Sequence, residues 1–141
     1  MEVILLIQTL SCAFLTGLIW VIQILHYPAF AEISAERFAA FHTAHSRNIT
    51  FIVAPMMLVE LVTAVWLVAL EPRDVVFIFN AIGAVAIWLS TFFLSVPLHN
   101  KLALQGDSLV IQRLVATNWP RTILWSVRLV LLAIVLYRQL V

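Results

Sequence analysis

The chain has 141 residues, of which 64% are hydrophobic and only 11% are charged, and its formal net charge is +1. A soluble domain carries about 25% charged residues, so this chain has too few charges to cover the surface of a water-soluble globule. A single cysteine, three glycines and the lack of a basic patch also exclude a disulfide-rich scaffold, a disordered chain and a nucleic-acid-binding protein. We therefore expect a small integral membrane protein whose main partner is the lipid bilayer.

Four segments are long and apolar enough to cross a bilayer, which takes about 20 helical residues. The first, at about residues 3–25, and the third, at about 75–98, hold no charged residue. The second, which ends near residue 70, contains Glu60, and the fourth, at about 119–138, contains Arg128. Backbone polar groups cannot stay unpaired in lipid, so all four segments should be helices. We predict an all-α, integral membrane four-helix bundle in one domain over residues 1–141.

Capping residues mark the starts of two of these helices. Ser34 is a suitable N-cap and Glu36 follows it in the first turn, where the helix dipole favours an anion. They predict that an interfacial helical extension precedes the second span, so that this helix covers residues 35–70. Asn118 is a natural N-cap for the fourth helix, and Pro120 fits its first turn because the N–H that proline lacks is not needed there.

The connections between the spans predict how the chain is oriented. Residues 71–74 form a tight turn, whereas the longer connections, 26–47 and 99–118, lie together at the opposite end of the bundle. The basic residues at the end with the tight turn are Arg73 and Arg138. The end with the longer connections is more basic, since it holds Arg37, Arg47, Lys101, Arg113 and Arg121. The positive-inside rule therefore places this more basic end in the cytoplasm and both termini outside.

All four histidines of the chain, His26, His42, His45 and His99, fall at this basic end. His42 and His45 are neighbours on one helix face, about 5–6 Å apart at their Cβ atoms, so both imidazoles can ligate one ion. His26 and His99 would reach the same place from adjacent helices. Imidazole suits iron, copper or zinc, and we predict that these four residues bind such a metal ion or a haem. The alternative is that they are interfacial residues that cap helices and anchor the bundle.

A polar stripe runs down the fourth helix from the histidine end into the bundle. Arg121, Trp125 and Arg128 recur at intervals of four and three residues and so share one face. A charge as deep as Arg128 needs an interior partner, and Glu60 in the second span is the acidic residue at a comparable depth. We predict a buried ion pair between Glu60 and Arg128, which either fixes helix register or takes part in catalysis.

Parts of the chain resemble known membrane proteins. The segments Val96-Pro97-Leu98-His99-Asn100-Lys101-Leu102 and Asn118-Trp119-Pro120-Arg121-Thr122, with Trp125, resemble a family of small four-helix membrane proteins that includes the anthrone oxygenases of polyketide pathways. The N-terminal half is similar to a group of bacterial membrane proteins. The residues that carry this second similarity are His26-Tyr27-Pro28, Phe41-His42 with His45, Pro55-Met56 and Glu60.

The resemblance implies oxygenation of a hydrophobic phenolic or quinone-like substrate that arrives from the bilayer. Removal of a proton from an activated carbon gives a carbanion that reacts with dioxygen. His99 is the candidate base, because histidine titrates near pH 6.5, and Arg121 is the candidate group to hold the developing enolate oxygen. A metal ion bound by the histidines is compatible with related oxidative chemistry.

Three function classes are consistent with the sequence. The first is a membrane oxidoreductase or oxygenase with a histidine-rich site. The second is a non-catalytic protein that binds a metal ion or haem, or serves as an accessory subunit. The third is a small proton-coupled transporter in which Glu60 carries the proton, which a fixed Arg128 counter-charge would disfavour. A bundle of four helices has little interior volume for a large substrate, so a homodimer is a plausible assembly.

Overall fold

The computed structural model describes residues 1–104 and 106–140, and these residues are almost entirely helical, with no strand among them. Four helical stretches in the described chain are long and apolar enough to cross a membrane, namely Glu2–Glu32, Ala35–Leu70, Val75–Ala103 and Ser108–Gln139. The predicted fold class, an all-α four-helix bundle, is confirmed. The composition and these four helices make the chain a multi-pass membrane protein.

Two of the four stretches are uninterrupted α-helices and two are broken into shorter elements. The uninterrupted helices are α3 (Ala35–Leu70) and α6 (Ser108–Leu140). The first stretch consists of α1 (Glu2–Val21), the π-helical turn η1 (Ile22–His26), α2 (Tyr27–Ala29) and the 3₁₀ turn η2 (Phe30–Glu32). The third consists of α4 (Val75–Ser90), the π-helical turn η3 (Thr91–Ser95) and α5 (Val96–Leu104).

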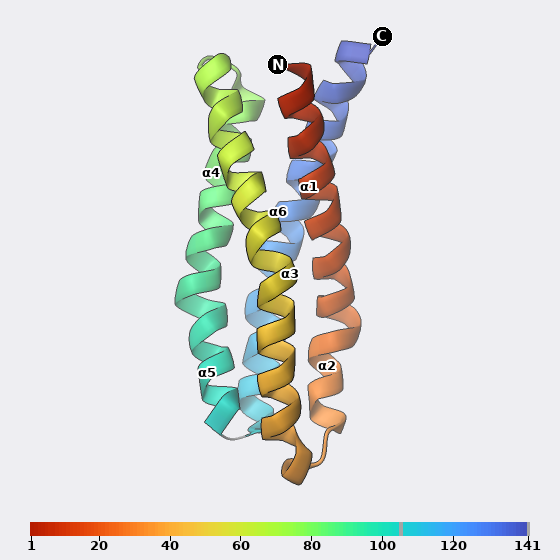
Figure 1. Ribbon diagram of the computed structural model, residues 1–141, viewed down its shortest axis with the longest axis vertical. Helices are drawn as coiled ribbons and strands as arrows, with labels where there is room; N and C mark the ends of the chain where they lie inside the picture. The colour runs from red at the N-terminus through yellow and green to blue at the C-terminus, as the bar shows by residue number, and fades with distance from the viewer. Residues whose placement is uncertain (105, 141) are drawn as a thin grey trace.

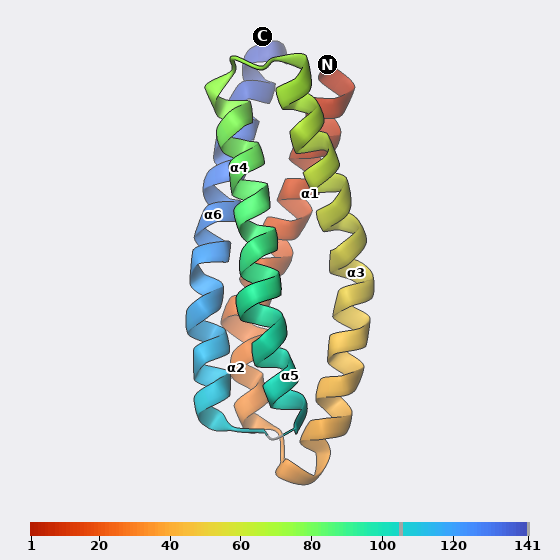
Figure 2. The same cartoon turned by 90° about the vertical axis from the view of Figure 1, so that its left-hand side faces the viewer.

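The four stretches run side by side along the long axis of the molecule (Figure 1). Both termini lie at one end, together with the turn between α3 and α4. The opposite end is formed by α2, α5 and the first turns of α3 and α6 (Figure 2). We call this opposite end the histidine end, because His26, His42, His45 and His99 lie in these elements or next to them. Helix α1 packs against both α3 and α6, and α4 also packs against both.

The long connection predicted over 99–118 is wrong, whereas α3 covers residues 35–70 as predicted, so that only residues 33 and 34 of the connection 26–47 are not helical. The first stretch stays helical as far as Glu32, and α5 runs to Leu104, so the helices at the histidine end are joined by only a few residues. Helix α6 begins at Ser108, where the Asp107 carboxylate accepts a hydrogen bond of 2.8 Å from the backbone N–H of Leu109. The helices extend past the apolar spans with polar turns, which hydropathy alone does not detect.

The N-cap predicted at Asn118 is therefore also wrong. Asn118 is buried inside α6, and its amide donates a hydrogen bond of 2.8 Å to Gln23. Pro120 lies within the same helix, not at its start. At the start of α3, by contrast, Ser34 is the N-cap residue and Glu36 lies in the first turn as predicted, although the Ser34 side chain makes no capping hydrogen bond.

A polar network lies inside the half of the bundle that holds the termini. Arg128 is fully buried and its Nη1 lies 3.0 Å from Oε1 of Glu60, while its Nε donates to Asn80 at 3.0 Å. Asn80 also accepts a hydrogen bond from Gln8 in α1, so all four stretches meet at this point. Gly83 permits the close approach, because a Cβ atom there would lie only 2.7 Å from Cδ of Arg128.

Candidate functional site

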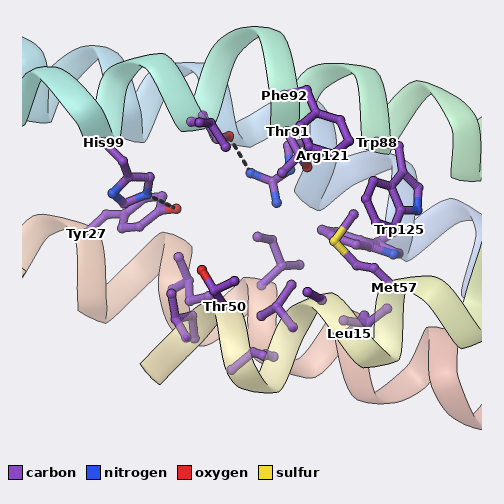
Figure 3. Close-up of a pocket in the computed structure, with 18 residues that line it drawn as sticks. Leu15, Tyr27, Thr50, Met57, Trp88, Thr91, Phe92, His99, Arg121 and Trp125 are labelled. Atoms are coloured by element: carbon purple, nitrogen blue, oxygen red, sulfur yellow. Dashed lines mark hydrogen bonds between the residues drawn. The ribbon is translucent and has the colours of Figure 1, made fainter. Parts of the chain in front are cut away.

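A cavity of about 230 Å³ opens between the four helical stretches, midway between the polar network and the histidine end. Figure 3 shows its walls, which come from all four stretches and are mostly apolar. Few polar side chains interrupt them, and these are Tyr27, Thr50, Thr91, Ser95, His99 and Arg121. An apolar chamber with a few convergent polar groups is the usual form of a small-molecule site.

Arg121 is the only charged side chain among the described residues that line this cavity. It is 6% exposed, and its Nη1 donates a hydrogen bond of 2.6 Å to Oγ of Ser95. Its Cζ lies 5.4 Å from the ring centre of Trp125, within cation–π range. Its Nε has no hydrogen-bond partner in the described part of the chain. In Figure 3 the guanidinium stands in the open space of the cavity, so it can bind an oxygen of a ligand.

Tyr27 and His99 lie at the other side of the cavity and are joined to each other (Figure 3). The Tyr27 hydroxyl is 3.1 Å from Nε2 of His99, and Nδ1 of His99 is 3.0 Å from Nε2 of His42. His42 and His99 also line a second cavity of about 320 Å³ between α3 and α5. A hydrogen-bonded chain therefore leads from the first cavity to the second, and a proton can pass along such a chain.

The structure brings all four histidines together. Nε2 of His26 lies 2.7 Å from Nδ1 of His45, and these two line a third cavity between α1, η1 and α3. The ring centres of His45 and His99 are 5.8 Å apart, which joins this pair to the pair formed by His42 and His99. Within residues 1–104 and 106–140, no three His, Cys, Asp or Glu side chains already have the arrangement of a metal site. The ring nitrogens face one another in pairs.

The two π-helical turns explain how the chain places these residues. Pro28 follows the end of η1 by two residues, and Pro97 follows the end of η3 by two residues. Proline has no N–H and its ring clashes with the carbonyl group four residues earlier, here in the middle of each π turn. Each helix widens by one residue at that point. Such widened turns are frequent at functional sites, and here one directly precedes Tyr27 and the other contains Ser95.

Trp125 connects the cavity to the buried ion pair. Its ring lines the cavity, and its Nε1 donates hydrogen bonds of 3.0 and 3.2 Å to the two carboxylate oxygens of Glu60. The stripe of Arg121, Trp125 and Arg128 thus faces the bundle interior over its whole length. Glu60 lies behind the tryptophan and does not line the cavity.

The sequence did not identify Tyr27 or Ser95 as site residues. Tyr27 lies between His26 and Pro28, and the proline was the signal for the π turn that sets the direction of the tyrosine. Gln23, one turn before His26, does not line the cavity: its amide group accepts from Asn118 and donates to the Val115 carbonyl. It ties the first stretch to α6.

Comparison with known protein families, with curated proteins and with solved structures finds no match to this chain.

Proposed function

We propose that the protein is a membrane oxidoreductase of the oxygenase type, which acts on a hydrophobic, weakly acidic phenolic or quinone-like molecule. The observation that carries this proposal is the polar set within the apolar cavity: Arg121 with an unused donor, and the hydrogen-bonded pair of Tyr27 and His99. The resemblance of residues 96–102 and 118–122 to anthrone oxygenases supports the same chemistry.

Two cavity residues have different roles in the proposed reaction. His99, beside the Tyr27 hydroxyl, receives the proton that leaves the activated carbon, and Arg121 stabilises the enolate oxygen that forms. Dioxygen then reacts at the carbanion. With anthrone as the substrate, one dioxygen converts the CH₂ group into a carbonyl and one water leaves, so that anthraquinone is the product.

The cavity is open toward the membrane. Thr50, Phe92 and Val96 line it and are also exposed on the outer surface of α3, η3 and α5. Since the bundle surface in these spans faces lipid, an apolar substrate can enter sideways without crossing water.

Replacement of Arg121 by glutamine should weaken binding of an acidic aromatic ligand by 10- to 100-fold. A hydrogen bond to a charged group contributes about 1.5–3 kcal/mol, and glutamine keeps the shape but loses the charge. Binding of anthrone, 1-naphthol and a short-chain benzoquinone can be followed by quenching of tryptophan fluorescence, because Trp88 and Trp125 line the cavity.

The matched control is Arg113→Gln, an exposed arginine on the same helix, which should bind like the wild type. Failure of all three probes to bind the wild-type protein, or equal affinity in the Arg121→Gln variant, would contradict the proposal. Consumption of one dioxygen per anthrone by the wild type in liposomes tests the oxygenase step itself.

The histidine cluster favours a second candidate, a metal-binding or accessory membrane protein without catalytic activity. Catalytic activity distinguishes the two candidates, because only the first converts a molecule bound in the cavity into a product. The transporter hypothesis has less support, because Glu60 pairs with Arg128 and is covered by Trp125 on the cavity side.

We infer that the histidine end faces the cytoplasm. Arg121 belongs to the cavity and no longer counts as a loop charge, but the exposed basic residues at this end still outnumber Arg73 and Arg138 at the other. They are Arg37, Arg47, Lys101 and Arg113.

Single cysteines test this orientation. In a Cys12→Ala background, a cysteine in place of Arg138 should react with a membrane-impermeant maleimide on intact spheroplasts. A cysteine in place of Arg37, at the other end, should react only after the membrane is permeabilised. The reverse pattern would show that the histidine end faces outward.

A further inference from the structure

Three of the histidines lie slightly farther apart than the ligands of one metal ion do. The ring centres of His42, His45 and His99 are 5.3, 5.8 and 6.4 Å apart. Imidazoles that bind a tetrahedral ion at about 2.0–2.1 Å have ring centres about 5 Å apart. To hold an ion, the distances between the ring centres would have to shorten by about 1 Å or less on average. Rotation of the side chains supplies a shift of this size.

The ring nitrogens of these three histidines differ in their partners. Nε2 of His42 and Nδ1 of His99 form a hydrogen bond of 3.0 Å with each other, which an ion bound between them would replace, while Nε2 of His45 and Nδ1 of His42 are buried with no partner in the described chain. The opposite nitrogens are held from behind, Nδ1 of His45 by His26 and Nε2 of His99 by Tyr27. Metal-binding histidines characteristically have their second nitrogen fixed by another group in this way.

The surroundings of the cluster are mostly apolar, and the charged side chain that shares a cavity with it in the described chain is Arg121, beside His99. The Phe30 ring lies 5.2–6.5 Å from all four histidine rings, and Phe38 stacks on His42 at 5.8 Å. Among the described residues, no acidic side chain makes a hydrogen bond or ion pair with a histidine of the cluster. An all-imidazole set of this kind selects iron, copper or zinc over magnesium and calcium.

We propose that His42, His45 and His99 bind one divalent transition-metal ion, with His26 and Tyr27 as the groups that orient two of the ligands. A bare ion fits better than haem, because two nitrogens on opposite sides of a haem iron lie about 4 Å apart, twice a bond of about 2.0 Å. The facing nitrogens are 2.7 and 3.0 Å apart. Three ligands leave a fourth position for water or a ligand.

The metal site extends the proposed function. It depends on that proposal only for the role of His99. When Nδ1 of His99 binds the ion, Nε2 carries the hydrogen and donates it to Tyr27. An ion held by His42, His45 and His99 would supply a bound water whose pKa is lowered to about 7, and His99 would then act as a ligand instead of as the base.

The test is a titration of the metal-free protein in detergent with Co²⁺, followed by the visible absorption of the ion, together with metal analysis of protein purified with iron, copper or zinc in the medium. We expect one ion per chain. His42→Ala, His45→Ala and His99→Ala should each lower the affinity by more than 100-fold, and His26→Ala and Tyr27→Phe by about 10- to 100-fold. Asn100→Ala, an exposed neighbour of His99, is the matched control and should bind normally.

Two further measurements keep the result interpretable. His45→Cys supplies a different ligand at the same place and should restore binding if a histidine-to-alanine variant fails to fold. Absence of Co²⁺ binding by the folded wild type, or normal binding by His45→Ala, would overturn the site. Ligand quenching is measured on the same samples, so a protein that binds metal but no aromatic probe refutes the proposed function and keeps the site. The opposite result refutes the site alone.

Discussion

Replacement of Arg128 by methionine is expected to lower the free energy of unfolding by about 3–5 kcal/mol, the cost of removing one partner of a buried ion pair. Glu60 would remain in the core, where it is 1% exposed, with the Trp125 N–H as its hydrogen-bond donor but without a positive partner among the described residues. Asn80 would lose a donor as well. Thermal unfolding in detergent, or the fraction unfolded in increasing SDS, measures the effect.

The double variant Glu60→Gln/Arg128→Met should recover much of the lost stability, because it removes both charges and leaves no unpaired ion in the core. Arg138→Met is the matched control, since Arg138 is exposed on the same helix and contributes about 0–1 kcal/mol at most. If Arg128→Met unfolds at the wild-type temperature, the ion pair does not stabilise the bundle.

Replacement of His99 by glutamine is expected to reduce kcat/KM for anthrone oxidation by about 10²- to 10⁴-fold, the usual contribution of a general acid or base. Glutamine can still accept the hydrogen bond from Tyr27 but cannot take up a proton. Dioxygen consumption in liposomes measures the rate. Unchanged quenching of tryptophan fluorescence by anthrone would show that the loss lies in the reaction and not in binding.

The metal content of the same variant separates the two roles of His99. A variant that keeps its ion but has lost activity shows that His99 is the base, whereas simultaneous loss of ion and activity shows that it is a ligand. Phe93→Leu, a lipid-facing neighbour of the cavity residue Phe92, is the control and should keep full activity. Wild-type activity in His99→Gln would refute both roles.

The spans and the contact between Glu60 and Arg128 could be predicted because both follow from the free energy of burial in lipid. An apolar stretch of 20 residues has few stable places other than the membrane, and a lone interior charge has few possible partners. Asn118 and Pro120 misled the prediction because their capping preferences are local and weak. Packing of Asn118 against Gln23 outweighs them, and a proline is tolerated inside a long helix.

Tyr27 could not be assigned from the sequence for a different reason. Its direction depends on the π turn before it, and hydrophobic periodicity assumes 3.6 residues per turn throughout. The same applies to the side chains that follow η3, whose angular positions are shifted relative to those of α4. The histidine contacts depend on the angular shifts at both η1 and η3. These turns lie in different stretches, so no single segment of the sequence reveals the contacts.

The widened turns make the site depend on helix geometry as well as residue identity. If η3 became a regular α-helix with the same number of residues, everything beyond it would rotate by about 100° around the axis. His99 would then leave the cluster although every residue of the cluster is still encoded. A chain with all four histidines and the same number of residues before Pro97, but with a regular α-helix in place of η3, would therefore lack the site.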